Sequence, residues 1–441
     1  MNPTPTTPSL LISKTTTAHY DNLAFKVFLC STFFIVIFSV TAIHSWPSQA
    51  KHVSILLACI LPVAIVVLPR IPIWFREKKI PKEVLWALLV FLAGIISSIL
   101  SEKSWPTTKS TILFVASGPV IFVAARYLFE PARNQEIFLW TTNLILLGFG
   151  FLGIYEYSYS GGIFLFSENP LPAGASLILL LASPIILLTR KCSTPLRLAL
   201  IFSLISSVIL IILLAKKGPL LSLIIIFLFS VGLIHLKYQK LLLGLALLAG
   251  CLLLTSESAI LKYKNILKLN SSITLRAEHY FFGFHVFKKN PVWGLGYNPS
   301  LLKYYYCDIT STSETDLCLN EFNYNPTFFE QERSFYWGYY STFRTFENIV
   351  LTFLVEMGGL FSAVYFAGVI YIFAVFFKKF RAPPQKNLAG MLTIAVLVGF
   401  AFISCTFDTL RFPNLNWLFH SFLGLMVNLQ KNSSEYSSEI N

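Results

Sequence analysis

Twelve apolar runs divide the chain, and their length and spacing limit its fold more than any other feature. A helix needs roughly 20 mainly apolar residues to cross a bilayer, and backbone groups in lipid are satisfied inside helices. The runs are centred near Phe34, Leu61, Leu92, Val120, Leu147, Leu180, Ser206, Ile225, Leu247, Val364, Val396 and Phe422. The last two of these runs are the shortest. With 55% hydrophobic and 12% charged residues, the sequence predicts an all-α integral membrane protein of about 12 spanning helices.

Four segments follow from these runs. Residues 1–23 form a tail rich in Thr, Ser and Pro, which we expect to be disordered. Residues 24–430 form the polytopic transmembrane domain. Residues 259–346 contain no spanning run and form a large loop inserted between the ninth and tenth helices. Residues 431–441 form a second short tail.

Lys and Arg in the connections predict the orientation, because positive residues stay on the cytoplasmic side. The clearest basic connections are Arg70 to Lys82, Arg190 to Arg197 and Lys378 to Lys386. Both termini are therefore predicted to be cytoplasmic, and the long loop periplasmic, in a bacterial inner membrane. The first run is long enough to span and lacks a small-residue cleavage pattern, so we expect a retained helix. The net charge of +13 reflects this bias and contacts with lipid headgroups, so no nucleic-acid partner is predicted.

Metal and nucleotide chemistry are not expected. The chain has only four aspartates, and the first outer loop, His44 to His52, has no acidic residue that could hold a divalent cation. No glycine loop with the Lys and Ser or Thr of a nucleotide site is present. We therefore predict no metal and no cofactor.

Two of the seven cysteines, Cys307 and Cys318, lie in the external loop. An oxidising compartment would allow them to form a disulfide, although sequence spacing alone does not decide the pairing. The other five lie in apolar runs or beside a helix end, where a buried thiol acts as a small hydrophobe.

The tight connection Ala215-Lys216-Lys217-Gly218-Pro219 places two lysines on the predicted external side, where the charge rule disfavours them. Their side chains either extend to lipid headgroups or bind an anionic ligand at the membrane surface. Gly218 and Pro219 favour a helix start, where free amide groups also attract an anion.

The long loop carries a second basic candidate. Residues 273–289 are predicted to form a helix in which Arg276, His279 and Gly283 recur at spacings of three and four. The helix should stop at Asn290-Pro291, before the turn Gly294-Leu295-Gly296, whose glycines would let backbone amides approach a ligand. Twenty-two aromatic residues lie between positions 259 and 346, and they form an interfacial belt, stack on sugar rings, or do both.

Glu347 and Asn348 begin the tenth run, and Glu356 follows nine residues after Glu347. This spacing puts the two glutamates near opposite faces of one helix, so they do not form a paired-carboxylate site. If only one faces a cavity, the other needs a different partner. Glu347 is either a catalytic base or a carboxylate stabilised by the helix dipole.

These residues together resemble the O-antigen ligase and O-antigen polymerase superfamily, over roughly Ile211 to Phe377. The resemblance rests on Arg276, Asn290-Pro291-x-x-Gly294-x-Gly296, Glu347-Asn348 and Gly358-Gly359. It implies a GT-C-like membrane fold with a large periplasmic loop between helices 9 and 10. It also implies metal-independent, inverting transfer of a polyprenyl-diphosphate-linked glycan. Two positions depart from the family: the ligase branch has His where this chain has Glu347, and the second glycine of the family pair falls on Phe361.

The resemblance also implies residues that hold the donor diphosphate. Arg276 matches the loop arginine of the family, and Lys217 matches a second arginine at an external helix end. Lys keeps the charge of Arg and loses its bidentate geometry. Lys216, Arg333 and Arg344 are the further candidates for this role.

Transfer also needs a base that receives the proton of the acceptor hydroxyl. Glu347 is the predicted base, and His279 is the alternative because it lies one helical turn from Arg276.

The predicted function is that of a ligase that transfers the lipid-linked glycan to an acceptor hydroxyl, such as that of lipid A-core. One alternative is a polymerase that extends the lipid-linked glycan. A second is a non-enzymatic transporter or flippase of lipid-linked sugars, which would need charged groups at several midmembrane positions. The predicted partners are the polyprenyl-diphosphate-linked donor, a glycan or lipid A-core acceptor, and membrane lipids.

Overall fold

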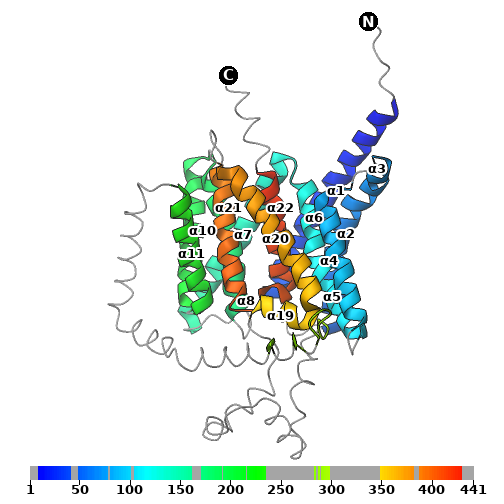
Figure 1. Ribbon diagram of the computed structural model, residues 1–441. Helices are drawn as coiled ribbons and strands as arrows, with labels where there is room; N and C mark the ends of the chain where they lie inside the picture. Colours follow the sequence, from blue (N-terminus) through cyan, green and yellow to red (C-terminus); the bar gives the residue numbers. More distant parts are fainter. Residues whose placement is uncertain are drawn as a thin grey trace, which may run out of the picture.

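The computed structural model is an all-helical bundle (Figure 1). It describes residues 8–40, 48–77, 80–100, 104–160, 170–190, 192–214, 216–234, 283–284, 287–288, 290–297, 348–381 and 387–429. The first part of the chain forms α1 (Pro8–Val40), α2 (Ser48–Val67), η1 (Leu68–Arg70), α3 (Ile71–Arg76), α4 (Lys82–Ile99), α5 (Ser104–Ser117), α6 (Pro119–Leu128) and α7 (Ala132–Ser160). The rest forms α8 (Pro170–Leu180), α9 (Ala182–Leu188), α10 (Thr194–Leu213), α11 (Lys217–Ile234), α19 (Ile349–Thr352), η2 (Phe353–Met357), α20 (Gly358–Arg381), α21 (Leu388–Ser404), η3 (Thr409–Arg411) and α22 (Pro413–Asn428).

Eight helical stretches in the described part are long and apolar enough to cross a membrane, which confirms a multi-pass membrane protein. They are Tyr20–Ile37, Val53–Arg76, Lys82–Ile99, Thr107–Leu128, Ala132–Tyr159, Leu171–Leu188, Thr194–Leu213 and Ile349–Phe380. Gly218–Ser230 and Leu388–Ser404 are apolar but shorter. The run near Leu247 and most of loop 259–346 lie outside the described residues, so the count of twelve and the position of the loop stay predictions.

The first helix begins earlier than the sequence indicated. Helix α1 starts at Pro8, whereas residues 1–23 were expected to form a disordered tail. No glycine or proline lies between Pro8 and the first apolar run, so nothing in this segment interrupts a helix that extends from the run.

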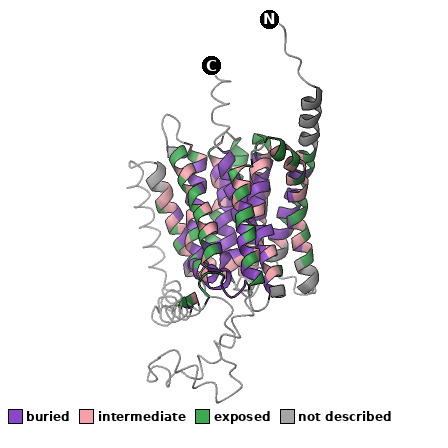
Figure 2. Ribbon diagram, turned by 45° about the vertical axis from the view of Figure 1, so that its right-hand side comes forward, coloured by how far each residue is buried: buried purple, intermediate pink, exposed green. Residues whose placement is uncertain are grey.

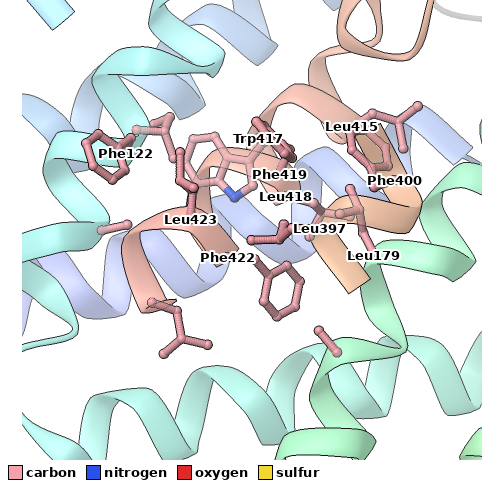
Figure 3. Close-up of a cluster of buried hydrophobic side chains, with 14 of the residues drawn as sticks. Phe122, Leu179, Leu397, Phe400, Leu415, Trp417, Leu418, Phe419, Phe422 and Leu423 are labelled. Carbon is pink, nitrogen blue, oxygen red and sulfur yellow. The ribbon is translucent and has the colours of Figure 1, made fainter. Parts of the chain in front are cut away.

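Helix α22 is enclosed by the bundle, because every residue from Asn414 to Asn428 is buried. Buried residues, drawn in purple, gather in the middle of the bundle (Figure 2). Its Trp417 stacks on Phe28 of α1 with ring centroids 5.0 Å apart. Leu418, Phe422 and their neighbours fill the space between α22 and the surrounding helices (Figure 3). The short last run of the sequence is therefore an enclosed helix.

Buried polar side chains connect α22 to α5 and α6. The helix is interrupted at Gly118, between α5 and α6, because Pro119 has no N–H to continue the helical hydrogen bonds. The Asn416 side chain donates to the carbonyl of Phe114 (2.8 Å) and to the hydroxyl of Ser117 (2.9 Å). A Cβ at Gly118 would lie 2.5 Å from the Asn416 side chain, so glycine is needed for this contact. The interrupted backbone is thereby satisfied inside the bundle, as lipid requires.

One end of the bundle, where α19 lies, gathers several helix ends and is called here the α19 end (Figure 1). Helix α20 leaves this end and packs against α4, where the Trp86 indole donates to the carbonyl of Val364 (3.1 Å). Helices α11 and α21 also pack against each other. The connection from α21 to α22 lies at the α19 end as well. The candidate site lies here.

Candidate functional site

The turn Asn290–Tyr297 is joined to the backbone between α19 and α20. The amide of Leu295 donates to the carbonyl of Val355 (2.9 Å), and the amide of Gly296 donates to the carbonyl of Glu356 (2.7 Å). In the opposite direction, the amide of Gly359 donates to the carbonyl of Pro291 (2.8 Å). The motif of the loop and the glycine pair of the following helix therefore form one structural unit.

Two glycines make this unit possible. Gly294 has φ +71°, and Gly358 has φ +82° with ψ 168°, a conformation that is essentially restricted to glycine. A Cβ built on Gly358 would lie 2.2 Å from the carbonyl oxygen of Val292. We expected these glycines to bring backbone amides to a ligand. That interpretation was wrong for Leu295 and Gly296, because their amides bind carbonyls of the protein itself.

Asn348 is the N-cap of α19. Its side-chain oxygen accepts from the amides of Val350 (3.0 Å) and Leu351 (3.2 Å). The preceding residue, Glu347, lies outside the described residues. Asn348 therefore occupies the N-cap position, and Glu347 is the residue before it.

Five polar residues gather beneath the turn and are called here the Arg411 cluster: Tyr297, Thr352, Glu356, Asp408 and Arg411. The guanidinium of Arg411 donates to the Oε1 atom of Glu356. The Thr352 hydroxyl lies 2.8 Å from both carboxylate oxygens of Asp408. Arg411 Nε lies 4.0 Å from Asp408 Oδ2, and Arg411 Cζ lies 5.6 Å from the centre of the Tyr297 ring. The cluster thus joins the loop turn, the start of the tenth run and the last connection.

Burial controls the electrostatics of this cluster. The Glu356 side chain is 1% exposed, and the Arg411 side chain is 12% exposed. Burial lowers the pKa of Arg411 to about 10, so the guanidinium remains a cation at neutral pH. Burial raises the pKa of Tyr297 above its ordinary value, so its hydroxyl keeps its proton. The cluster therefore holds one cation and neutral hydroxyl groups beside carboxylates at neutral pH.

Glu356 lies in η2, which is a π-helical turn. Such turns are rare in helices and frequent at functional sites. The partner of Glu356 is Arg411. Sequence reasoning missed Arg411 because it lies 55 residues from Glu356 and belongs to no recognised motif.

The Lys216-Lys217-Gly218 connection reaches the same region. A Cβ at Gly218 would meet Thr406 Oγ1 at 3.1 Å and Ile403 Cγ1 at 3.2 Å, so this connection contacts the end of α21. Lys216 is half-buried, and the side chain of Lys217 lies outside the described residues. The α19 end therefore brings together this connection, the loop turn and the start of α19, all next to residues 403–411.

The remaining predicted site residues are not placed. Arg276, His279, Arg333, Arg344 and Glu347 lie outside the described residues, as do Cys307 and Cys318. Within the described ranges, no three His, Cys, Asp or Glu side chains gather as a metal site.

An apolar groove of about 570 Å³ starts at the same end. It lies between α11, α20 and α21 and reaches Phe377 near the other end of α20. Leu410, which precedes Arg411, lines it, so the apolar groove and the charged cluster are adjacent. Other lining residues are Phe229, Val350, Phe400 and Cys405.

Comparison with known families adds to this geometry. Residues 201–366 match the family model Wzy_C, described as O-Antigen ligase. No curated protein matches the chain. The matched range includes most of α10, all of α11, the Asn290–Tyr297 turn and the start of α20, and it confirms the resemblance predicted from the sequence. Residues 201–366 of this multi-pass membrane protein therefore carry an O-antigen ligase domain.

Proposed function

We propose that the protein is a ligase that transfers a glycan from a polyprenyl-diphosphate carrier to an acceptor hydroxyl, such as that of lipid A-core. The α19 end would face the periplasm, with both termini on the cytoplasmic side of a bacterial inner membrane. One observation carries the proposal: the Lys216 connection, the Asn290–Tyr297 turn and the start of α19 converge at one end of a membrane bundle. These are the segments in which the sequence predicts the diphosphate and base residues.

The reaction assigns a role to each predicted residue. The acceptor hydroxyl attacks the anomeric carbon from the face opposite the diphosphate, and the bond from that carbon to the diphosphate oxygen breaks. The electron pair leaves with the diphosphate, whose charge Arg276 and Lys217 would neutralise. Glu347 would take the hydroxyl proton, with His279 as the alternative base. Inversion at the anomeric carbon follows from this single displacement, and no metal takes part.

Further cations can serve the diphosphate if Lys217 only contacts lipid headgroups. Arg333 and Arg344 lie nearer the end of the loop in sequence, and Lys216 is half-buried beside the end of α21. Charge-assisted hydrogen bonds from such groups contribute about 1.5–3 kcal/mol each to holding a diphosphate.

The apolar groove fits the lipid part of the donor. A polyprenyl tail is apolar throughout, whereas its diphosphate stays near the membrane surface. A tail in the groove between α11, α20 and α21 would leave the diphosphate at the α19 end, near the Lys216 connection. This arrangement supports a lipid-linked donor over a soluble one.

The test is transfer by the purified full-length protein in lipid nanodiscs. The protein is incubated with polyprenyl-diphosphate-linked glycan and with lipid A-core, and the products are separated by size and by lipid content. We expect a glycan attached to lipid A-core. A longer lipid-linked glycan would instead identify a polymerase, and an unchanged donor with every acceptor would overturn the proposed transfer.

A further inference from the structure

Two buried side-chain oxygen atoms of the Arg411 cluster have no hydrogen-bond partner among the residues that the structure describes. They are Oε2 of Glu356 and the hydroxyl oxygen of Tyr297. Both residues contact Arg411, and they are 1% and 6% exposed. Buried polar groups are nearly always paired, so two such atoms around one guanidinium call for an explanation.

The other groups of the cluster limit what could satisfy these atoms. A carboxylate oxygen accepts hydrogen bonds, so its partner must be a donor. At neutral pH a diphosphate has hydrogen-bond acceptors and no donors. The carboxylates of Glu356 and Asp408 would also repel its negative charge. A cation would meet the positive charge of Arg411. A neutral hydroxyl group avoids both conflicts, because it donates to the carboxylate and accepts from a phenol or a guanidinium.

We propose that the Arg411 cluster is a subsite for a sugar hydroxyl of the acceptor glycan. The hydroxyl donates to Glu356 Oε2 and accepts from the hydroxyl of Tyr297. Arg411 is a positioning residue: by holding Oε1 of Glu356, it leaves Oε2 for the sugar. This inference rests on the proposed function and deepens it, because it assigns the acceptor a place apart from the predicted diphosphate residues.

Arg411 is the more exposed partner of the ion pair, so the cluster meets its surroundings at this residue. The π-helical turn and the unusual backbone of Gly358 hold Glu356 at this position. Thr352 donates to both oxygens of Asp408, so in this cluster the carboxylate oxygen without a described partner belongs to Glu356.

Tyr297→Phe is the main test, because it removes only the hydroxyl. The ring contacts with Phe114 and Phe353 remain, with centroids 5.5 and 6.1 Å from the Tyr297 ring. We expect the KM for the acceptor to rise roughly tenfold, the effect of one lost hydrogen bond. The kcat and the KM for the donor should stay within about twofold.

Glu356→Gln is the second variant. Its amide oxygen can still accept from Arg411, but the negative acceptor for the sugar is lost. We expect the acceptor KM to rise by roughly 10- to 100-fold, because a hydrogen bond to a charged group is stronger. Ser203→Ala in α10 is the matched control, since Ser203 also carries a buried hydroxyl with no partner among the described residues. Its kinetics should equal those of the wild type.

A binding measurement without donor separates this inference from the proposed function. Equilibrium dialysis of full-length protein in nanodiscs uses two probes, delipidated core oligosaccharide and inorganic pyrophosphate. We expect Tyr297→Phe to weaken oligosaccharide binding roughly tenfold and to leave pyrophosphate binding unchanged. This loss of binding supports the subsite even if the wild-type protein transfers no glycan. Absence of transfer would contradict the proposed function but not the subsite. If Tyr297→Phe binds the oligosaccharide as tightly as the wild type does, only a buried water occupies the cluster. If the variant binds pyrophosphate more weakly, the cluster is an anion site. Either result overturns the inference.

Discussion

Gly294 and Gly358 meet so closely that a Cβ built on Gly294 would lie 2.4 Å from the amide nitrogen of Gly358. Both residues have positive φ, and four backbone hydrogen bonds surround the contact. At this contact the long loop is thus attached to the tenth run through backbone hydrogen bonds. Any side chain at either position would separate the turn from the helix that carries Glu356.

Gly358→Ala tests this attachment. The added methyl group clashes with the carbonyl of Val292, and the backbone conformation of Gly358 costs other residues about 1–3 kcal/mol. We expect a lower unfolding temperature in detergent and a loss of most transfer activity. Gly148→Ala in α7 is the control, because a Cβ there meets nothing within 4 Å. Equal stability of the two variants would contradict the role given to Gly358.

Arg276→Ala tests the cation for the leaving diphosphate. Transfer should be abolished while the protein remains folded and inserted, because charge-assisted hydrogen bonds contribute about 1.5–3 kcal/mol each. Arg276→Lys should restore only part of the activity, since it loses the bidentate geometry. The measurement is transfer by purified variants whose size-exclusion profiles match the wild type. Wild-type turnover by Arg276→Ala would refute the assignment.

Lys217 and Lys216 give a paired comparison on one turn. Lys217→Ala should reduce transfer more than Lys216→Ala, and Lys217→Arg should be tolerated or improved, because Arg supplies two parallel hydrogen bonds to a phosphate. The same transfer assay ranks the three variants. If Lys217→Ala is as active as the wild type, the lysine serves lipid headgroups, and Arg333 and Arg344 are the next cations to test.

Glu347→Gln distinguishes a base from a stabilising charge. As a base, Glu347 cannot be replaced by Gln, and transfer should slow by roughly 10² to 10⁴ fold. Because Asn348 caps α19, the stability cost should stay below about 1 kcal/mol. Glu347→His should keep measurable transfer, since His accepts a proton near neutral pH. Normal turnover by Glu347→Gln would make the carboxylate structural, and His279→Ala would then be examined.

Cys405 reports on the apolar groove, because it is exposed and lines that groove. Partial desolvation by neighbouring groups raises the pKa of the Cys405 thiol, so maleimide labelling should speed up as the pH rises above the ordinary thiol range. In a variant with Cys405 as its only cysteine, polyprenyl diphosphate should slow labelling, whereas inorganic pyrophosphate should not. A variant with only Cys30, which is exposed on α1, is the control. Equal labelling rates with and without the lipid would place the tail elsewhere.

Reporter fusions test the orientation. A fusion after Leu301 should act as periplasmic and one after Lys386 as cytoplasmic, because basic connections stay inside. Alkaline phosphatase and green fluorescent protein fusions give opposite signals for the two sides. The inverse pattern would put the long loop on the wrong side for an acceptor in the periplasm.

Features that depend on contiguous residues were predictable from the sequence. Apolar length indicates spanning helices, and eight described stretches confirm this class. A turn was expected at Asn290-Pro291, and Gly294 and Gly296 both adopt positive φ in this turn. Glycine and proline act through their own backbone geometry, so their effects can be predicted without the rest of the fold.

The partners of the polar residues depended on the tertiary structure. Arg411 meets Glu356 across 55 residues, and Thr352 meets Asp408 across 56, although no spacing rule connects either pair. The glycine turn was expected to bind a ligand, yet its amides bind η2, because helix packing brings those carbonyls within reach. An apolar run specifies that a helix crosses the membrane, but it does not specify which helix lies beside it. The angle and register of packing decide which side chains meet, and these emerge only when all the helices assemble.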